Sequence, residues 1–439
     1  QITPPLFVLL SFRFMHYEVN KHCLHTLRLK FRNMVMKNIT KTPLQRFLLL
    51  ITLILSISLQ YPQPKLDIAY YSELATSYTL SVGKRKRDTS PLDGITVVIT
   101  GSTSGIGLGL TKALYGLGAT IVAVGRSPTK LTKLGEEVGE TTLSERKRIV
   151  PIVADFQDLD SVSSAADKIK SKFKRIDFLI NNAGMHSYGI GQKSSTVQGY
   201  DLVFGVNYLA PFLLTQKLIP LLERSTMPNS PRIIQVTSSF HCSVDGSTLV
   251  PTKSASSSPS ASQPNSSIIH GLKSYAASKL AQIYHARSLT REFQQRQSPI
   301  KILSICPLWV ATNIAGSFMK NLLSVFAFES NGYGLAPILY AMFHPVSGVE
   351  DGEYNDFVSN CSIPINNKIL EWIFGWHFFE ITGIRQTFCY TIVGPTLLLL
   401  QKFFATVGYK ETSYESFNVD NQDALFQWSK DTISPWMKK

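Results

Sequence analysis

Residues 96–107 constrain the fold of this chain more than any other stretch. The β-branched run at residues 96–100 is typical of a buried parallel strand. Glycines follow at positions 101, 105 and 107, and a helical pattern of apolar residues comes after them. Strand, glycine turn and helix form a unit that binds a dinucleotide, because the backbone can approach a pyrophosphate at the helix N-terminus. The spacing Gly-x-x-x-Gly-x-Gly departs from the usual Gly-x-Gly-x-x-Gly, so the turn alone leaves an ordinary strand-to-helix connection open.

From residue 93 onward, predicted strands alternate with predicted helices. Five further apolar runs predict strands, at residues 120–124, 149–154, 176–180, 232–236 and 300–305. This alternation predicts an α/β fold, a single Rossmann-type domain with a doubly wound parallel sheet. A ligand binds such a sheet at the carboxyl ends of its strands.

Composition divides the chain into segments with different expected roles. We expect an irregular basic extension (1–45), a hydrophobic anchor or signal segment (46–60), a linker (61–92), the Rossmann-type domain (93–360) with a Ser-rich insertion (243–267), an apolar and aromatic insertion (361–410) that forms a lid or membrane-interfacial element, and a C-terminal helix packed on the domain (411–439).

The apolar run at residues 47–59 is shorter than a membrane span, which needs about 20 residues. An uncleaved signal anchor or an interfacial helix is the preferred interpretation. A cleaved targeting peptide and a buried core helix remain alternatives.

Charge and cysteine content exclude some classes of function. The chain has 44 Lys and Arg against 30 Asp and Glu, and much of the excess lies in residues 13–46 and 84–87. Basic residues favour the cytosolic side of a bilayer, so these runs predict a membrane-proximal flank. Nucleic-acid binding is not expected, because no aromatic-interleaved basic patch accompanies them. The five cysteines lack CxxC spacing, which argues against a disulfide framework and against a metal site.

Tyr275 and Lys279 lie four residues apart on one face of a predicted helix. A free tyrosine has a pKa of about 10, and a nearby ammonium lowers it toward the range in which the phenol can exchange a proton at neutral pH. Ser238, at the end of the preceding strand, can hydrogen-bond a substrate oxygen on which charge develops. A Tyr-x-x-x-Lys pair alone is common on helix surfaces, but the glycine turn and the segment Asn181–Gly184 make a catalytic pair the better interpretation.

Together these motifs resemble those of the short-chain dehydrogenases/reductases over about residues 93–360. The matching stretches are Thr100-Gly-Ser-Thr-Ser-Gly-Ile-Gly107, Asn181-Asn-Ala-Gly184, Asn207, Ser238 and Tyr275-x-x-x-Lys279. The sequence Tyr275-Ala-Ala-Ser-Lys-Leu-Ala-Gln282 is similar to that found in the branch of retinol dehydrogenases and protochlorophyllide-reductase-like proteins. The resemblance implies an oxidoreductase that transfers hydride between a nicotinamide cofactor and a carbonyl or hydroxyl carbon.

The resemblance also implies a role for each catalytic candidate. Tyr275 would be the general acid or base. Lys279 would lower the pKa of that tyrosine and hold the nicotinamide ribose. Ser238 would orient the carbonyl or hydroxyl group, or Ser239 would do so if the register slips by one residue. Asn207 would support a proton relay through water to Lys279.

Cofactor contacts are implied in the same way. Asn182 would line the cofactor cleft and Asp155 would hydrogen-bond the adenine. The positions that the resemblance assigns to the cofactor are Gly101, Ser102, Ser104, Gly105, Ile106, Gly107, Arg126, Asp155, Asn182, Ala183, Gly184, Tyr275, Lys279, Pro307, Val310 and Thr312.

Arg126 predicts which nicotinamide cofactor is used. An acidic residue after the second strand would bind the ribose 2′-hydroxyl of NAD and repel a 2′-phosphate. This chain has Gly125-Arg126 there, and arginine suits a phosphate by charge and by fork geometry. We therefore predict NADP(H) rather than NAD(H). The alternative is an arginine that only caps the edge of the sheet.

The substrate and the location are expected from the apolar segments and the family branch. Residues 314–330 and 361–410 are rich in apolar and aromatic side chains, which favours a lipophilic substrate of the retinoid, sterol or fatty-acyl type. We expect membrane association, at the endoplasmic reticulum or another organelle membrane, and the resemblance suggests a homodimer. Two alternatives stay open: reduction of a carbon–carbon double bond, and a catalytically idle relative that binds NADP(H) as a sensor or scaffold.

Overall fold

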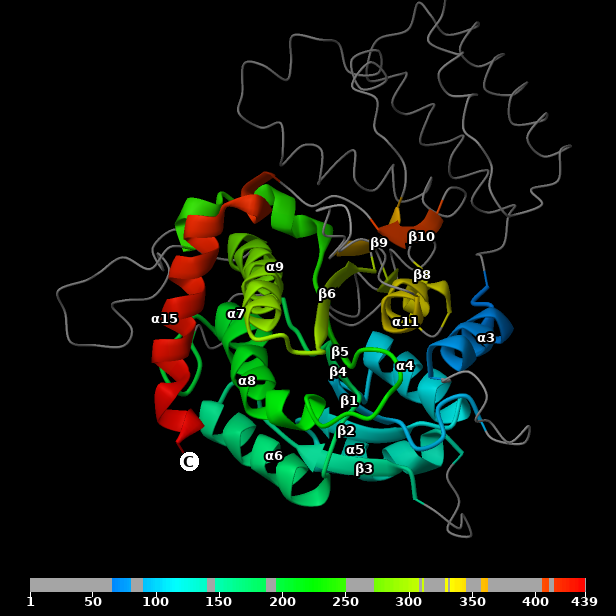
Figure 1. Ribbon diagram of the computed structural model, residues 1–439. Helices are drawn as coiled ribbons and strands as arrows, with labels where there is room; N and C mark the ends of the chain where they lie inside the picture. Colours follow the sequence, from blue (N-terminus) through cyan, green and yellow to red (C-terminus); the bar gives the residue numbers. More distant parts are fainter. Residues whose placement is uncertain are drawn as a thin grey trace, which may run out of the picture. The chain divides into compact units, whose positions relative to one another are not determined.

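The computed structural model describes residues 65–79, 90–139, 147–186, 195–249, 272–307, 310–311, 328–330, 332–344, 357–361, 405–409 and 414–438 (Figure 1). The chain divides into two compact units, Gln1–Pro62 with Ile363–Phe403, and Gln63–Ser362 with Phe404–Lys439. All described residues belong to the second unit. The predicted extension, anchor segment and most of the 243–267 and 361–410 insertions lie outside the described residues.

The described part of the chain has one main sheet of eight strands in the order β3-β2-β1-β4-β5-β6-β9-β10. The strands are β1 Thr96–Thr100, β2 Thr120–Gly125, β3 Ile149–Val153, β4 Phe178–Asn181, β5 Arg232–Val236, β6 Lys301–Cys306, β9 Phe357–Cys361 and β10 Ala405–Tyr409. Neighbouring strands are parallel from β3 to β9, and only the pair β9–β10 is antiparallel. A two-stranded pair of β7 (Val310–Ala311) and β8 (Phe328–Glu329) lies apart from this sheet. The predicted doubly wound parallel sheet is therefore confirmed.

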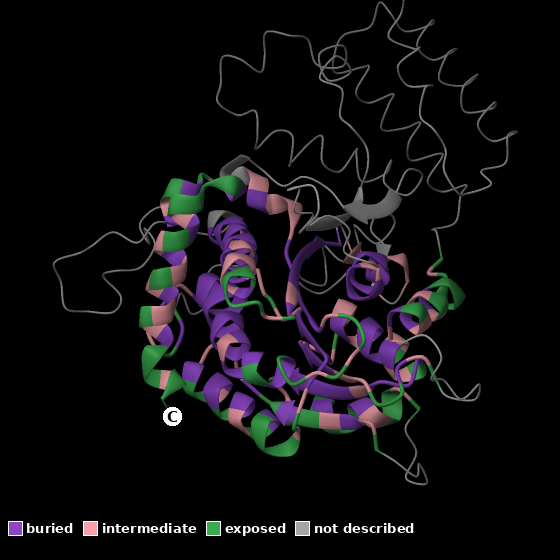
Figure 2. Cartoon of the chain, viewed as in Figure 1, coloured by how far each residue is buried: buried purple, intermediate pink, exposed green. Residues whose placement is uncertain are grey.

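Helices cover both faces of the sheet. The helices on one face are α3 (Ile68–Thr79), α4 (Gly105–Gly116), α5 (Pro128–Glu137) and α11 (Ala336–Phe343), and those on the other are α6 (Leu159–Lys172), α8 (Ala210–Leu222), α9 (Leu272–Gln295) and α15 (Val419–Met437). Within β1, Val97 and Ile99 are buried against the face covered by α3, α4, α5 and α11. Val98 is buried against the face covered by α6, α8, α9 and α15. This follows from the two-residue period of a strand. Figure 2 shows the result, with buried strands between helices whose outer faces are exposed.

Helix α3 lies inside the segment 61–92, which the sequence predicts to be a linker. Its Tyr71 and Tyr78 are buried, and their hydroxyls donate to the backbone carbonyls of Ala336 and Ser230. Asn229 in turn donates to the carbonyl of Tyr78. The helix is therefore attached to the core through tyrosines that are apolar on their rings and polar at their tips.

One described helical stretch, Leu202–Leu222, is long and apolar enough to cross a membrane, but 94% of it is buried inside the protein. It consists of α7 (Leu202–Phe204), a π-helical turn η2 (Gly205–Leu209) and α8. Its apolar character is therefore that of a core helix. The π-helical turn carries Asn207, and such turns often occur at functional sites.

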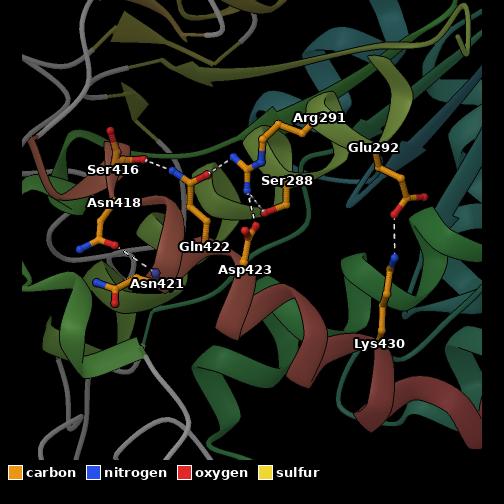
Figure 3. A network of polar contacts seen from close by, with 9 residues as sticks. All are labelled: Ser288, Arg291, Glu292, Ser416, Asn418, Asn421, Gln422, Asp423 and Lys430. Atoms are coloured by element: carbon orange, nitrogen blue, oxygen red, sulfur yellow. Dashed lines mark hydrogen bonds and ion pairs between the residues drawn. The ribbon is translucent and has the colours of Figure 1, made fainter. Parts of the chain in front are cut away.

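Helix α15 packs along α9 through buried leucine and isoleucine side chains and through polar contacts at its rim. Gln422 donates to the carbonyl of Ser416 and accepts from Arg291, which also pairs with Asp423 (Figure 3). Lys430 pairs with Glu292 further along the same two helices.

The apolar contacts of α15 are expected to stabilise the protein more than its ion pairs. Leu425 is 0% exposed, so Leu425→Ala is expected to lower the free energy of unfolding by about 2–5 kcal/mol. Asp423→Asn, two residues away, is expected to lower it by less than about 1 kcal/mol because that pair is exposed to solvent. Denaturant unfolding of both variants checks this. Equal losses would show that the ion pair has a larger role than its exposure allows.

Candidate active site

The polar segments singled out in the sequence follow the carboxyl ends of neighbouring parallel strands. The glycine-rich turn follows β1, residues 182–184 follow β4, and Ser238 follows β5. The strand order changes direction between β1 and β4, which is where doubly wound sheets bind their ligands.

The glycine turn brings helix α4 very close to the end of β1. Gly101 and Gly105 have positive φ angles of 68° and 53°, which favour glycine. A Cβ atom on Gly107 would lie 2.1 Å from the carbonyl oxygen of Gly101 and 2.7 Å from Nδ2 of Asn182. Only glycine fits at position 107 without movement of the backbone.

The N-terminus of α4 is left open toward this edge of the sheet. Ser104 is the N-cap residue, and its side chain makes no capping hydrogen bond. The first N–H groups of the helix are therefore available to an anion. Ser102 is buried in the turn, with Oγ 3.4 Å from the carbonyl oxygen of Val124, and Ile106 is half-buried behind it.

Thr100 ties the end of β1 to the segment that follows β4. Its hydroxyl accepts hydrogen bonds from the backbone N–H groups of Asn182 and Ala183, both at 2.9 Å. The Asn182 side chain donates to the Thr100 carbonyl, also at 2.9 Å. Asn182 thus fixes the two strand ends against each other.

Gly184 connects this segment to the catalytic candidates. A Cβ atom on Gly184 would lie 3.3 Å from Oδ1 of Asn207 and 3.7 Å from Nζ of Lys279. A Cβ atom on Gly101 would lie 3.1 Å from Cα of Ala183. The glycine turn, residues 182–184, Asn207 and Lys279 therefore form one continuous group of contacts.

Asn207 is fully buried, and its side chain holds two elements together. Oδ1 accepts from the backbone N–H of Met185 at 2.8 Å, and Nδ2 donates to the Met185 carbonyl at 2.9 Å. Nδ2 also lies 3.0 Å from Oγ of Ser278 on α9. The asparagine therefore sets the position of α9 relative to the end of β4.

Lys279 points inward from α9, beside Tyr275. Its side chain is 3% exposed, and Nζ lies 5.4 Å from the centroid of the Tyr275 ring. Nζ donates to the carbonyl of Val236 at 2.8 Å. Burial lowers the pKa of Lys279 to about 7, and the neighbouring Cys306 partly opposes this.

The Tyr275 ring is half-buried and lies between two other rings. Its centroid is 4.7 Å from that of His186 and 6.0 Å from that of Phe240. Such contacts hold the ring in place.

Ser238 starts a short 3₁₀ helix, η3 (Ser239–Ser243). Its Oγ accepts from the N–H of Phe240 at 3.3 Å, and its carbonyl lies 2.7 Å from Nδ1 of His241. Burial lowers the pKa of His241 to about 4, so this imidazole is neutral at physiological pH. The backbone N–H of Ser239 donates to Sγ of Cys306, which fixes the register at this strand end.

The remaining cofactor candidates lie at the same edge or beyond the described residues. Arg126 follows β2, is exposed, and makes no hydrogen bond or ion pair within the described part of the chain. Asp155 follows β3 and accepts from the N–H of Gln157 at 3.1 Å. Pro307 follows β6 and is buried, and Val310 begins β7. Thr312 lies outside the described residues.

Three residues to which the sequence analysis assigns no role also belong to this group of contacts. Thr100 joins the ends of β1 and β4, Ser278 contacts Asn207, and Gln282 accepts from Nζ of Lys279 at 3.1 Å. Thr100 and Ser278 directly precede residues that were singled out. Gln282 lies one turn beyond Lys279, so the helical period alone could have indicated it.

Comparison with known proteins places this geometry in a family. The model of the family described as short chain dehydrogenase matches residues 95–256. Short-chain dehydrogenase/reductase iacJ of Pestalotiopsis fici is 30% identical over 263 residues, which cover 57% of this chain and 76% of that protein. Human polyprenol dehydrogenase is 28% identical over 297 residues, 65% of this chain and 84% of that protein. Dehydrogenase/reductase SDR family member 7B of Xenopus tropicalis is 36% identical over 139 residues, 31% of this chain and 45% of that protein.

The fold and the site thus define a nicotinamide-dependent oxidoreductase. This chain belongs to the short-chain dehydrogenase/reductase family. The family and the enzyme class that the sequence motifs imply are confirmed.

Proposed function

We propose that this protein transfers hydride between NADP(H) and a carbonyl or hydroxyl carbon of a lipophilic substrate, with Tyr275 as the general acid or base. The observation that carries the proposal is the buried ammonium of Lys279 5.4 Å from the Tyr275 ring, in one group of contacts with the glycine turn. A protein that only binds a dinucleotide has no need of a phenol next to a buried ammonium.

Each of the three side chains has its own role in the proposed reaction. Bound nicotinamide would supply or accept the hydride. When a carbonyl is reduced, the Tyr275 hydroxyl donates its proton to the substrate oxygen, and the Lys279 ammonium stabilises the phenolate that remains. The Ser238 hydroxyl donates a hydrogen bond to the same oxygen and stabilises its developing charge.

The glycine turn and the open N-terminus of α4 fit the pyrophosphate of the cofactor. The carboxyl edge offers uncapped N–H groups at Gly105–Gly107, and Gly107 leaves no side chain between helix and strand end. Arg126, exposed directly after β2, supports a cofactor with a 2′-phosphate.

Arg126→Asp is expected to reverse the cofactor preference. A carboxylate in place of the guanidinium removes charge-assisted hydrogen bonds and repels the 2′-phosphate, so NADPH affinity should fall about 100-fold. NADH affinity should stay the same or rise, because a carboxylate at this position can accept a hydrogen bond from the ribose 2′-hydroxyl. Fluorescence titration with both cofactors measures this.

Lys133→Asp is the matched control, because it makes the same charge change at an exposed position of α5. If Arg126→Asp lowers NADPH affinity no more than this control does, the arginine does not bind the 2′-phosphate.

A lipophilic substrate and a membrane location are supported by two observations. Residues 314–330 and 361–410 are rich in apolar side chains, and one relative is a polyprenol dehydrogenase, an enzyme named for a long isoprenoid alcohol. We infer retinoid, sterol or fatty-acyl type substrates, an organelle membrane such as the endoplasmic reticulum, and a homodimer.

The test is turnover of NADPH by the purified full chain with all-trans-retinal, decanal and a steroid ketone. Oxidation of NADPH by any of these at a rate well above that of the protein-free control supports the proposal. Turnover only with a conjugated carbon–carbon double bond would instead favour a double-bond reductase. NADPH binding without any turnover would favour a sensor or scaffold.

A further inference from the structure

Gln282 lies between Lys279 and the backbone of Asn207. Its side chain is 1% exposed. Oε1 accepts a hydrogen bond from Nζ of Lys279 at 3.1 Å, and Nε2 donates to the carbonyl oxygen of Asn207 at 2.8 Å. An amide turned by 180° would place its NH₂ group against the ammonium and its oxygen against the carbonyl. The partners therefore allow only one orientation.

Proline at position 211 removes one backbone donor for the Asn207 carbonyl. In an α-helix the carbonyl of residue 207 would accept from the N–H of residue 211, but residue 211 is proline and has no N–H. The side chain of Gln282 supplies a hydrogen bond in its place. The two hydrogen bonds of the amide thus connect the π-helical turn η2 with the ammonium on α9.

We propose that Gln282 is a positioning residue of the reaction, which holds the Lys279 ammonium beside Tyr275 and anchors it to the backbone of Asn207. This inference rests on the proposed roles of Tyr275 and Lys279.

The amide changes how Asn207 and Lys279 are connected. The family resemblance implies a relay through water between them, whereas the direct connection here is a carboxamide. A carboxamide holds its two partners but does not pass a proton from one to the other as water does. The amide therefore serves to hold Lys279 in place, where its protonated form stabilises the Tyr275 phenolate.

Gln282→Met tests this role, because methionine has a similar length and neither polar atom. Without Oε1, the ammonium keeps the Val236 carbonyl as an acceptor but loses the amide oxygen, so its charged form is less favoured and less well placed. NADPH binding should weaken about fivefold, since charge-assisted hydrogen bonds are the stronger kind. In alcohol oxidation, the acid limb of the pH profile should move up by about half a pH unit, because the phenolate loses part of its stabilisation.

Gln235→Met is the matched control. Gln235 is 0% exposed on β5, and its amide contacts His285 rather than Lys279. The titratable groups around the pair, Cys306 at the end of β6 and His186 beside Tyr275, are the same in both variants. A difference between the variants in NADPH affinity or in the pH limb is therefore due to Gln282.

The NADPH titration needs no substrate, so it decides the role of Gln282 even if no carbonyl compound is turned over and the proposed function fails. Gln282→Glu provides a second variant: it keeps an acceptor toward Lys279 but turns an oxygen toward the Asn207 carbonyl, so it is expected to bind NADPH more tightly than Gln282→Met and less tightly than the unmodified chain. Equal NADPH affinities of Gln282→Met and Gln235→Met would overturn the proposal. Gln282→Glu binding as tightly as the unmodified chain would also overturn it, since the donor to the Asn207 carbonyl would then have no part in the positioning.

Discussion

Replacement of Tyr275 by phenylalanine is expected to lower the turnover number about 1,000-fold or more, because it removes the group that exchanges a proton with the substrate oxygen. NADPH affinity should change less than about threefold, because Lys279 and the glycine turn stay in place. The phenylalanine ring can keep the contacts with His186 and Phe240. Steady-state kinetics with the best substrate of the panel, together with an NADPH titration, measures both effects.

Tyr284→Phe is the matched control for this experiment. Tyr284 lies on the same helix, is 1% exposed and packs in the hydrophobic core. Its variant is expected to retain the turnover number within about twofold at a temperature at which it is folded. Turnover by Tyr275→Phe that equals turnover by Tyr284→Phe would exclude Tyr275 as the proton donor.

The fold of the described core was predictable because its strands have a strong local signal. The runs at residues 120–124 and 149–154 were predicted as strands and correspond to β2 (Thr120–Gly125) and β3 (Ile149–Val153). Strands that are buried on both faces are continuous apolar runs, and glycine or polar residues end them. The position of a ligand site at their carboxyl ends follows from the parallel arrangement, without knowledge of any side-chain contact.

Edge elements were less predictable, since their local patterns are weak. Helix α3 is short, and the sequence around it has the composition of a linker. Its two buried tyrosines bind partners more than 150 residues away, which no local pattern indicates. Strands β9 (Phe357–Cys361) and β10 (Ala405–Tyr409) lie beyond the six strands that the apolar runs predicted, and β10 falls within the segment 361–410 that was expected to be an insertion.

Within the candidate site, the motifs indicated which residues carry the chemistry but not how they are held. Asn207 contacts Ser278, 71 positions away, and Gln282 contacts the Asn207 carbonyl across 75 positions. Such pairs exist only after the π-helical turn η2 and α9 have packed against each other, so no local pattern encodes them. The missing N–H of Pro211 is a clue in the sequence that the Asn207 carbonyl lacks its α-helical donor.

Gly107→Ala is expected to have the second large effect, on the cofactor rather than on chemistry. The added Cβ would lie 2.1 Å from the Gly101 carbonyl oxygen, a distance that backbone atoms must relieve by moving apart. The N-terminus of α4 would then withdraw from the strand end, and its N–H groups would no longer converge on a pyrophosphate. NADPH affinity is expected to fall at least about 100-fold, with a loss of stability of about 1–3 kcal/mol.

Gly116→Ala, at the other end of the same helix, separates this effect from a general intolerance of alanine. A Cβ atom on Gly116 would meet nothing within 4 Å, so alanine there is expected to raise stability by up to about 1 kcal/mol and to leave NADPH affinity unchanged. Thermal unfolding and NADPH titration of the two variants form one experiment. If Gly107→Ala binds NADPH as well as Gly116→Ala does, the close approach of α4 to β1 has no part in cofactor binding. A loss confined to Gly107→Ala would mean that cofactor binding depends on the absence of a side chain between the strand end and the helix.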